Sequence, residues 1–128
     1  MVNNLSILCG LISAVFILLN ALFYFLRDLY YISNNNKVKV FINKILPYLA
    51  KYNSIFILII FLFAILHIIL MYSINGFIIS SGYVILFVLL ILIKFYFFSY
   101  KKLKFNYGLN ILAYLLFISL FVHYVFKI

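Results

Sequence analysis

Four long apolar stretches, separated by shorter polar connections, make up most of the chain. A helix that crosses a bilayer needs about 20 apolar residues at a rise of about 1.5 Å per residue. The stretches that meet this requirement cover residues 5–26, 48–74, 77–98 and 107–126, and the second is most strongly apolar from Ser54 onward. The pattern therefore predicts an all-α membrane protein, a single domain built as a bundle of four transmembrane helices.

The connections between these stretches differ in character. The run Asn34-Asn35-Asn36 predicts a break after the first stretch. Beyond it, apolar residues recur at helical spacing among lysines, which is typical of a basic amphipathic segment lying in the headgroup plane. The apolar residues are Val38, Phe41, Ile45 and Leu49, and the lysines are Lys37, Lys39, Lys44 and Lys51. Pro47 is expected to bend the chain before the second stretch, and Asn75-Gly76 predicts a tight turn after it.

The composition agrees with a membrane protein. Hydrophobic residues make up 70% of the chain, charged residues make up 9%, and the mean hydropathy is +1.33. A soluble domain has about 45–50% apolar and about 25% charged residues. The net charge is +9, but the basic residues lie between the apolar stretches and not on one patch, which argues against nucleic acid as a partner. The first stretch has no basic region before it, so we interpret it as a retained helix and not a signal peptide.

The positions of lysine and arginine predict the orientation of the helices. The first connection carries Arg27 and four lysines, the third carries Lys101, Lys102 and Lys104, and the Asn75 turn carries none. Basic loops stay on the inner side of a membrane. We therefore expect both termini outside, an N-out/C-out arrangement, with the second and fourth helices running in the same direction.

The two histidines of the chain, His67 and His123, both lie inside apolar stretches. His67 lies 13 residues beyond Ser54, and His123 lies 16 beyond Tyr107. At about 1.5 Å per residue, both are about 20 Å or more above the inner interface. On parallel helices at similar depth, they could take both axial positions of one haem iron. They are the candidate cofactor-binding and metal-ligating residues, with one haem b as the cofactor, and no residue is predicted to be catalytic.

Two asparagines extend this pattern. Asn53 precedes His67 with 13 residues between them, and Asn110 precedes His123 with 12 between them. This frame resembles the ferric reductase-like and NADPH-oxidase-type transmembrane cytochromes b, where H-x13-H and H-x12-H pairs on two helices hold two stacked haems. The likeness covers roughly residues 50–128 and includes Ser81-Gly82-Tyr83, the basic loop after the third stretch, and "VHYVF" near the end. Because asparagine stands at both inner positions, the resemblance implies that one haem is kept, in the outer half of the bilayer.

An electron-transfer cytochrome b subunit is the function that this arrangement favours. A single haem near the outer face cannot carry electrons across the whole membrane, so a quinone or another membrane or redox subunit would have to complete the path. The sequence predicts no flavin or nicotinamide domain within these 128 residues. We therefore expect a component of an oxidoreductase system, with enzyme activity of its own left undecided.

Other functions remain open. Each histidine could instead hydrogen-bond a neighbouring helix, for example through Ser80, Ser81 or Tyr124, in a haem-free structural or assembly subunit of a larger, respiratory-type membrane complex. A small transporter ranks last, because four-span exporters of this size depend on an intramembrane glutamate and the chain has none. Asp28, the only acidic residue, is expected to pair locally with Arg27. The abundance of residues with AT-rich codons favours a bacterial cytoplasmic membrane or a mitochondrial inner membrane as the location.

Overall fold

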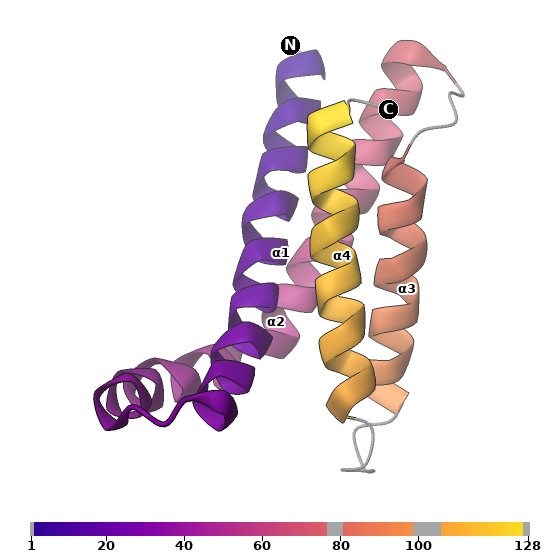
Figure 1. Cartoon of the computed structure of the whole chain (residues 1–128). Coiled ribbons are helices and arrows are strands. Elements are labelled where there is room, and N and C mark those ends of the chain that lie inside the picture. The colour runs from indigo at the N-terminus through magenta and orange to yellow at the C-terminus, as the bar shows by residue number, and fades with distance from the viewer. Residues whose placement is uncertain (1, 77–80, 99–105, 127–128) are drawn as a thin grey trace.

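The computed structural model describes residues 2–76, 81–98 and 106–126, and in these residues the chain forms four α-helices. The helices are α1 (Val2–Ile32), α2 (Asn36–Asn75), α3 (Gly82–Phe98) and α4 (Asn106–Phe126). They stand side by side, and the beginning of α1 lies at the same end of the bundle as the end of α4 (Figure 1). The all-helical fold that the apolar pattern predicts is confirmed.

Two of these helices are long. By length and composition, α1 and α2 could each cross a membrane, whereas the apolar helices Gly82–Phe97 and Asn110–Val125 are shorter. Large apolar side chains on α1, α2 and α3 face outward, as the exposures of Leu8 (53%), Leu62 (57%) and Phe87 (65%) illustrate. A soluble monomer rarely exposes a large continuous apolar surface, so this exterior indicates association with a membrane.

The helices form two antiparallel pairs. α1 packs most extensively against α2, and α3 packs against α4. The two pairs meet mainly where α1 contacts α4, while α2 and α3 contact each other over less of their length. All four helices contribute to one apolar core, which includes Ile17, Ile57, Ile60, Leu89, Leu92 and Leu116. In a membrane, such a core stabilises the bundle through van der Waals packing.

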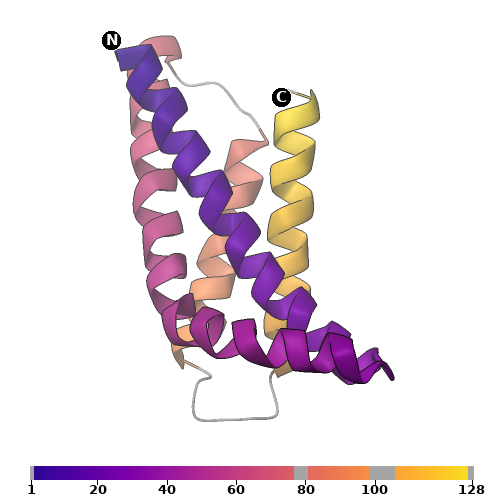
Figure 2. The same ribbon diagram turned by 90° about the vertical axis from the view of Figure 1, so that its left-hand side faces the viewer.

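The helix α2 contains both the predicted amphipathic segment and the spanning helix that is predicted to begin at about residue 48. Residues 33–35 form the predicted break, and the Asn35 side chain caps α2 by accepting a hydrogen bond from the Lys37 backbone N–H at 3.0 Å. Pro47 lies inside the helix. The first part of α2 crosses one end of the bundle, and the helix then turns to run along it (Figure 2). We attribute this bend to Pro47, which lacks an N–H donor and kinks a helix without having to end it.

The connection between α2 and α3 is longer than the predicted tight turn. Asn75 ends α2, and the Gly76 N–H donates to the Tyr72 carbonyl oxygen at 2.9 Å. Gly76 has φ 71° and ψ −163°, a positive-φ conformation that glycine adopts without steric cost and that residues with a Cβ essentially avoid. α3 begins only at Gly82, so Asn75-Gly76 ends a helix and does not form a two-residue turn. Residues 77–80, expected to open the third helix, and the lysines of the third connection lie outside the described residues.

Candidate functional site

A cavity of about 430 Å³ lies between the two helix pairs, near the beginning of α1 and the end of α4. Residues of all four helices form its wall, and most of them are apolar. Its polar lining consists of Ser13, His67, Tyr72, Asn75, Tyr83, His123 and Tyr124. Cofactor sites are typically clefts of about 300–1,000 Å³ with apolar walls and a few well-placed polar groups. The size and lining of this cavity fall within that description.

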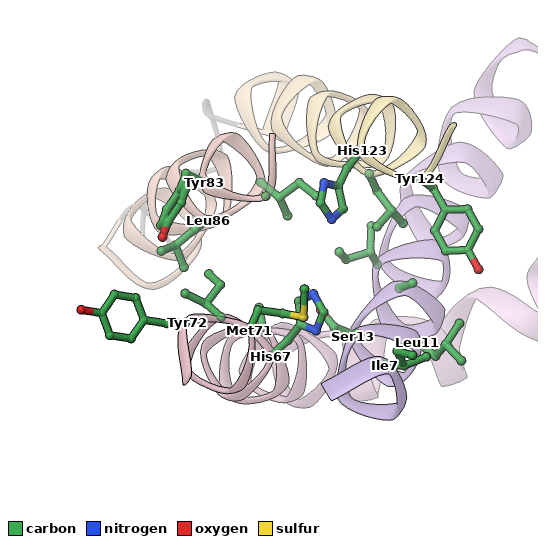
Figure 3. A pocket seen from close by; sticks show the side chains of 18 of the residues that line it. Ile7, Leu11, Ser13, His67, Met71, Tyr72, Tyr83, Leu86, His123 and Tyr124 are labelled. Carbon is green, nitrogen blue, oxygen red and sulfur yellow. The ribbon is translucent and has the colours of Figure 1, made fainter. Parts of the chain in front are cut away.

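His67 and His123 line this cavity from two different helix pairs. The His67 side chain enters from α2 and the His123 side chain from α4, and the two imidazoles lie on opposite sides of the same space (Figure 3). The structure thus brings together the two residues that the sequence predicts to lie at similar depth.

His67 is held against α1 by its Nδ1 atom. Nδ1 lies 2.7 Å from the Ser6 carbonyl oxygen and 3.2 Å from the Ser6 hydroxyl oxygen. A carbonyl oxygen can only accept a hydrogen bond, so Nδ1 must carry the hydrogen. In the neutral imidazole, the lone pair is then on Nε2, the atom left to coordinate a metal. Metal-binding histidines usually donate their other ring N–H to a carbonyl or carboxylate in this way.

Gly10 allows His67 to approach α1 this closely. A Cβ atom at this position would lie 3.1 Å from both Cε1 and Nδ1 of the His67 ring. This separation is below an ordinary carbon contact of about 3.5–4.0 Å, so a larger residue would have to push the ring aside. The sequence does not reveal this role of Gly10, because a glycine in an apolar helix gives no sign of which side chain will lie against it.

His123 is held in a comparable way at the start of α3. Its Nδ1 lies 2.7 Å from the Ser81 hydroxyl oxygen. When Nδ1 carries the hydrogen, the hydroxyl accepts it, and the lone pair is again on Nε2. The Ser81 carbonyl oxygen accepts the backbone N–H of Val84 at 3.1 Å, which ties this serine into the first turn of α3. Ser81 is one of the partners expected for a histidine, and the two histidines differ because His67 is held mainly by a backbone oxygen.

Asn110, the predicted inner counterpart of His123, does not line the cavity. Its Nδ2 donates to one Asp28 carboxylate oxygen at 2.6 Å, and its Oδ1 accepts a hydrogen bond from Arg27. Tyr114 donates to the other Asp28 oxygen at 2.5 Å. The Asp28 carboxylate, which the sequence predicts to pair locally with Arg27, hydrogen-bonds to two residues of α4 and so fastens α1 to that helix.

Asn53, the predicted inner counterpart of His67, also lies away from the cavity. It is 2% exposed and hydrogen-bonds to Tyr24, which is 1% exposed. Asn20 is fully buried on the inward face of α1. Side chains from α1 thus engage both inner asparagines, through Tyr24 for Asn53 and through Arg27 and Asp28 for Asn110.

Comparison of the chain with protein-family models, with curated proteins and with solved structures finds no match. Among the described residues, no group of three or more His, Cys, Asp or Glu side chains could hold a metal ion. A haem iron needs fewer protein ligands than such a group supplies. Four porphyrin nitrogens already hold the iron, and two protein ligands complete its coordination. His67 and His123 are the two imidazoles that the described residues offer at the cavity.

Proposed function

We propose that this chain is an electron-transfer subunit of a membrane that holds one haem b between His67 and His123. The observation that carries the proposal is the placement of both imidazoles on opposite sides of one apolar cavity, each fixed through Nδ1. When bound, haem b supplies a one-electron iron couple. The residues of the chain orient the two Nε2 ligands and surround the macrocycle with an apolar wall.

The proposal includes a bundle of four transmembrane helices with both termini outside. The long apolar helices α1 and α2 support it. The first part of α2, which carries Lys37, Lys39 and Lys44, crosses the end of the bundle opposite the beginning of α1 and the end of α4 (Figure 2). The cavity lies near the beginning of α1 and the end of α4. By the positive-inside rule, the end with these lysines faces inward and the cavity lies in the outer half of the bilayer. The membrane would be a bacterial cytoplasmic membrane or a mitochondrial inner membrane.

The proposal is for one haem and not two, because the inner half of the bundle offers no second pair of histidines. The inner ligand positions hold Asn53 and Asn110, whose side chains are engaged by Tyr24, Arg27 and Asp28. An amide is not a usual axial ligand of haem iron, and these amides already hydrogen-bond to α1. Electrons would therefore have to reach or leave the single haem through a partner, either a quinone or another membrane or redox subunit.

A haem-free structural or assembly subunit of a respiratory-type complex is the second candidate. The observation that favours it is that both histidine hydrogen bonds join separate helices, α2 to α1 through Ser6 and α4 to the start of α3 through Ser81. Interhelical hydrogen bonds of this kind stabilise membrane bundles. These two histidine hydrogen bonds do not explain why both imidazoles line a cavity of about 430 Å³. A small transporter ranks below both, since the chain has no glutamate.

The haem content of the purified protein separates the two candidates. The chain is expressed with an adequate haem supply, purified in detergent, and its haem counted per chain after extraction as the pyridine complex. We expect one haem per chain for the wild type, and loss of haem from both the His67→Ala and the His123→Ala variants. Circular dichroism checks that the variants remain helical. A helical wild-type protein without haem would favour the structural subunit.

A further inference from the structure

A row of polar residues follows the inward face of α1. Ser6, Ser13, Asn20 and Arg27 are each seven residues apart, and seven residues correspond to about two turns, so they share one face of the helix. Ser6 and Arg27 have polar partners on other helices, namely His67 and Asn110. Asn20 differs from them. It is fully buried, and neither its Oδ1 nor its Nδ2 has a hydrogen-bond partner within the described part of the chain.

Asn53 lies at the same level as Asn20, on the facing helix. Ser6 contacts His67, and both asparagines lie 14 residues from that contact, one along α1 and one along α2. Fourteen residues are close to four helical turns. Asn20 therefore lies on the same face of α1 as Ser6, and Asn53 lies on the same face of α2 as His67. Two other contacts between the helices lie near this level: the Phe16 and Phe56 rings, whose centroids are 5.6 Å apart, and the hydrogen bond between Tyr24 and Asn53.

Asn53 Oδ1 is also without a partner, so three amide atoms lack hydrogen bonds at this level. We propose that Asn20 and Asn53 enclose a bound water molecule. A water donates two hydrogen bonds, which match the two Oδ1 atoms, and accepts others, which matches Asn20 Nδ2. Buried waters typically make about three such bonds, and burying an amide without partners is unfavourable. A monovalent cation suits the site poorly, because the positive N–H groups of Asn20 would point toward it.

The proposed water site lies at one end of a larger cluster of polar residues. The inference of a bound water goes beyond the proposed haem function. Asn53 hydrogen-bonds to Tyr24, and the Arg27 guanidinium lies 5.2 Å from the centroid of the Tyr24 ring. Arg27 bonds Asn110, which in turn bonds Asp28. Polar groups thus lead from the Asn20 level toward the end of the bundle that carries the lysines, which gives the water a route of exchange.

X-ray hydroxyl-radical footprinting tests the site in the intact chain, because radicals formed from a bound water oxidise the side chains next to it. Tyr24 is 1% exposed and adjoins Asn53, so a dry interior would protect it, whereas Tyr48 is 69% exposed and serves as an internal reference. We expect oxidation of Tyr24 in the wild type and its loss in Asn20→Leu. Asn3→Leu, the same change at an exposed position of α1, should leave Tyr24 oxidation unchanged.

A wild-type protein in which Tyr48 is oxidised and Tyr24 is not would overturn the proposal, whether or not the Asn20→Leu variant folds. A high-resolution experimental structure gives a second, independent measurement. We expect density for one oxygen at about 2.7–3.2 Å from the Oδ1 atoms of Asn20 and Asn53 and from Asn20 Nδ2. A direct bond between the two amides with no such density, or a cation surrounded by oxygen ligands, would contradict it.

Discussion

Two serines hold the histidines in different ways, and replacing each by alanine should have different consequences for haem binding. Ser81 contacts His123 through its hydroxyl, with 2.7 Å between Oγ and Nδ1. Ser6 contacts His67 mainly through its backbone carbonyl, also at 2.7 Å, with the hydroxyl further away at 3.2 Å. Ser81→Ala therefore removes the side-chain oxygen that bonds the imidazole, whereas Ser6→Ala leaves the main acceptor in place.

The expected magnitudes follow from these contacts. Loss of the residue that orients a metal-binding histidine typically lowers metal affinity by about 10- to 100-fold. For Ser81→Ala this corresponds to about 1.4–2.8 kcal/mol of haem-binding free energy. For Ser6→Ala we expect a change well below about tenfold, because the carbonyl oxygen still accepts the Nδ1 hydrogen.

The assay is the equilibrium affinity for haem, measured by titrating haem into the apoprotein in detergent and following the absorbance. Ser73→Ala is the matched control, since Ser73 lies on an exposed part of α2 and its hydroxyl donates to the Leu70 carbonyl oxygen at 2.7 Å. This control should bind haem as the wild type does. Equal losses in Ser81→Ala and Ser6→Ala, or no loss in Ser81→Ala, would refute the assignment of Nδ1 as the orienting atom.

Three further predictions concern the supports of the bundle. Gly10→Ala should shift the His67 ring and weaken haem binding without loss of helix, because alanine is favoured over glycine in a helix by about 1 kcal/mol; an unchanged haem affinity would show that the ring tolerates the new methyl group. Asp28→Asn should lower the thermal unfolding temperature while the haem spectrum stays unchanged. The Asp28 carboxylate accepts hydrogen bonds from Asn110 and Tyr114, and hydrogen bonds to charged groups contribute about 1.5–3 kcal/mol each. Gly76→Ala should destabilise the protein by about 1–3 kcal/mol through its positive-φ backbone alone, because no atom lies within 4 Å of the added Cβ; thermal unfolding measures the change, and an unaltered midpoint would contradict this account.

The sequence predicted the features that depend on local periodicity. Long apolar stretches were enough to predict four helices, because each residue of a helix advances the chain by a fixed distance. Counting residues from the polar ends placed His67 and His123 at similar depth, and both line one cavity in the structure. The sequence predicted an amphipathic segment, a bend at Pro47 and a spanning helix from about residue 48, whereas the structure joins these parts into one helix, Asn36–Asn75, with Pro47 inside it.

Other features depend on which faces of different helices meet, and local periodicity does not determine this. The Ser6 carbonyl that holds His67 is a backbone atom, so no side-chain pattern reveals it. Gly10 matters only because the His67 ring lies against it. Likewise, the bond from Asn110 to Asp28 joins residues 82 positions apart and depends on the rotation of α4 relative to α1.

The absorbance spectrum of the dithionite-reduced protein tests the central claim most directly, because an iron with two imidazole ligands is low-spin. We expect a sharp alpha band of low-spin haem b in the wild type, and its loss in both His67→Ala and His123→Ala. A band that survives either substitution would contradict coordination by both histidines, and a well-folded, colourless wild-type protein would contradict haem binding altogether.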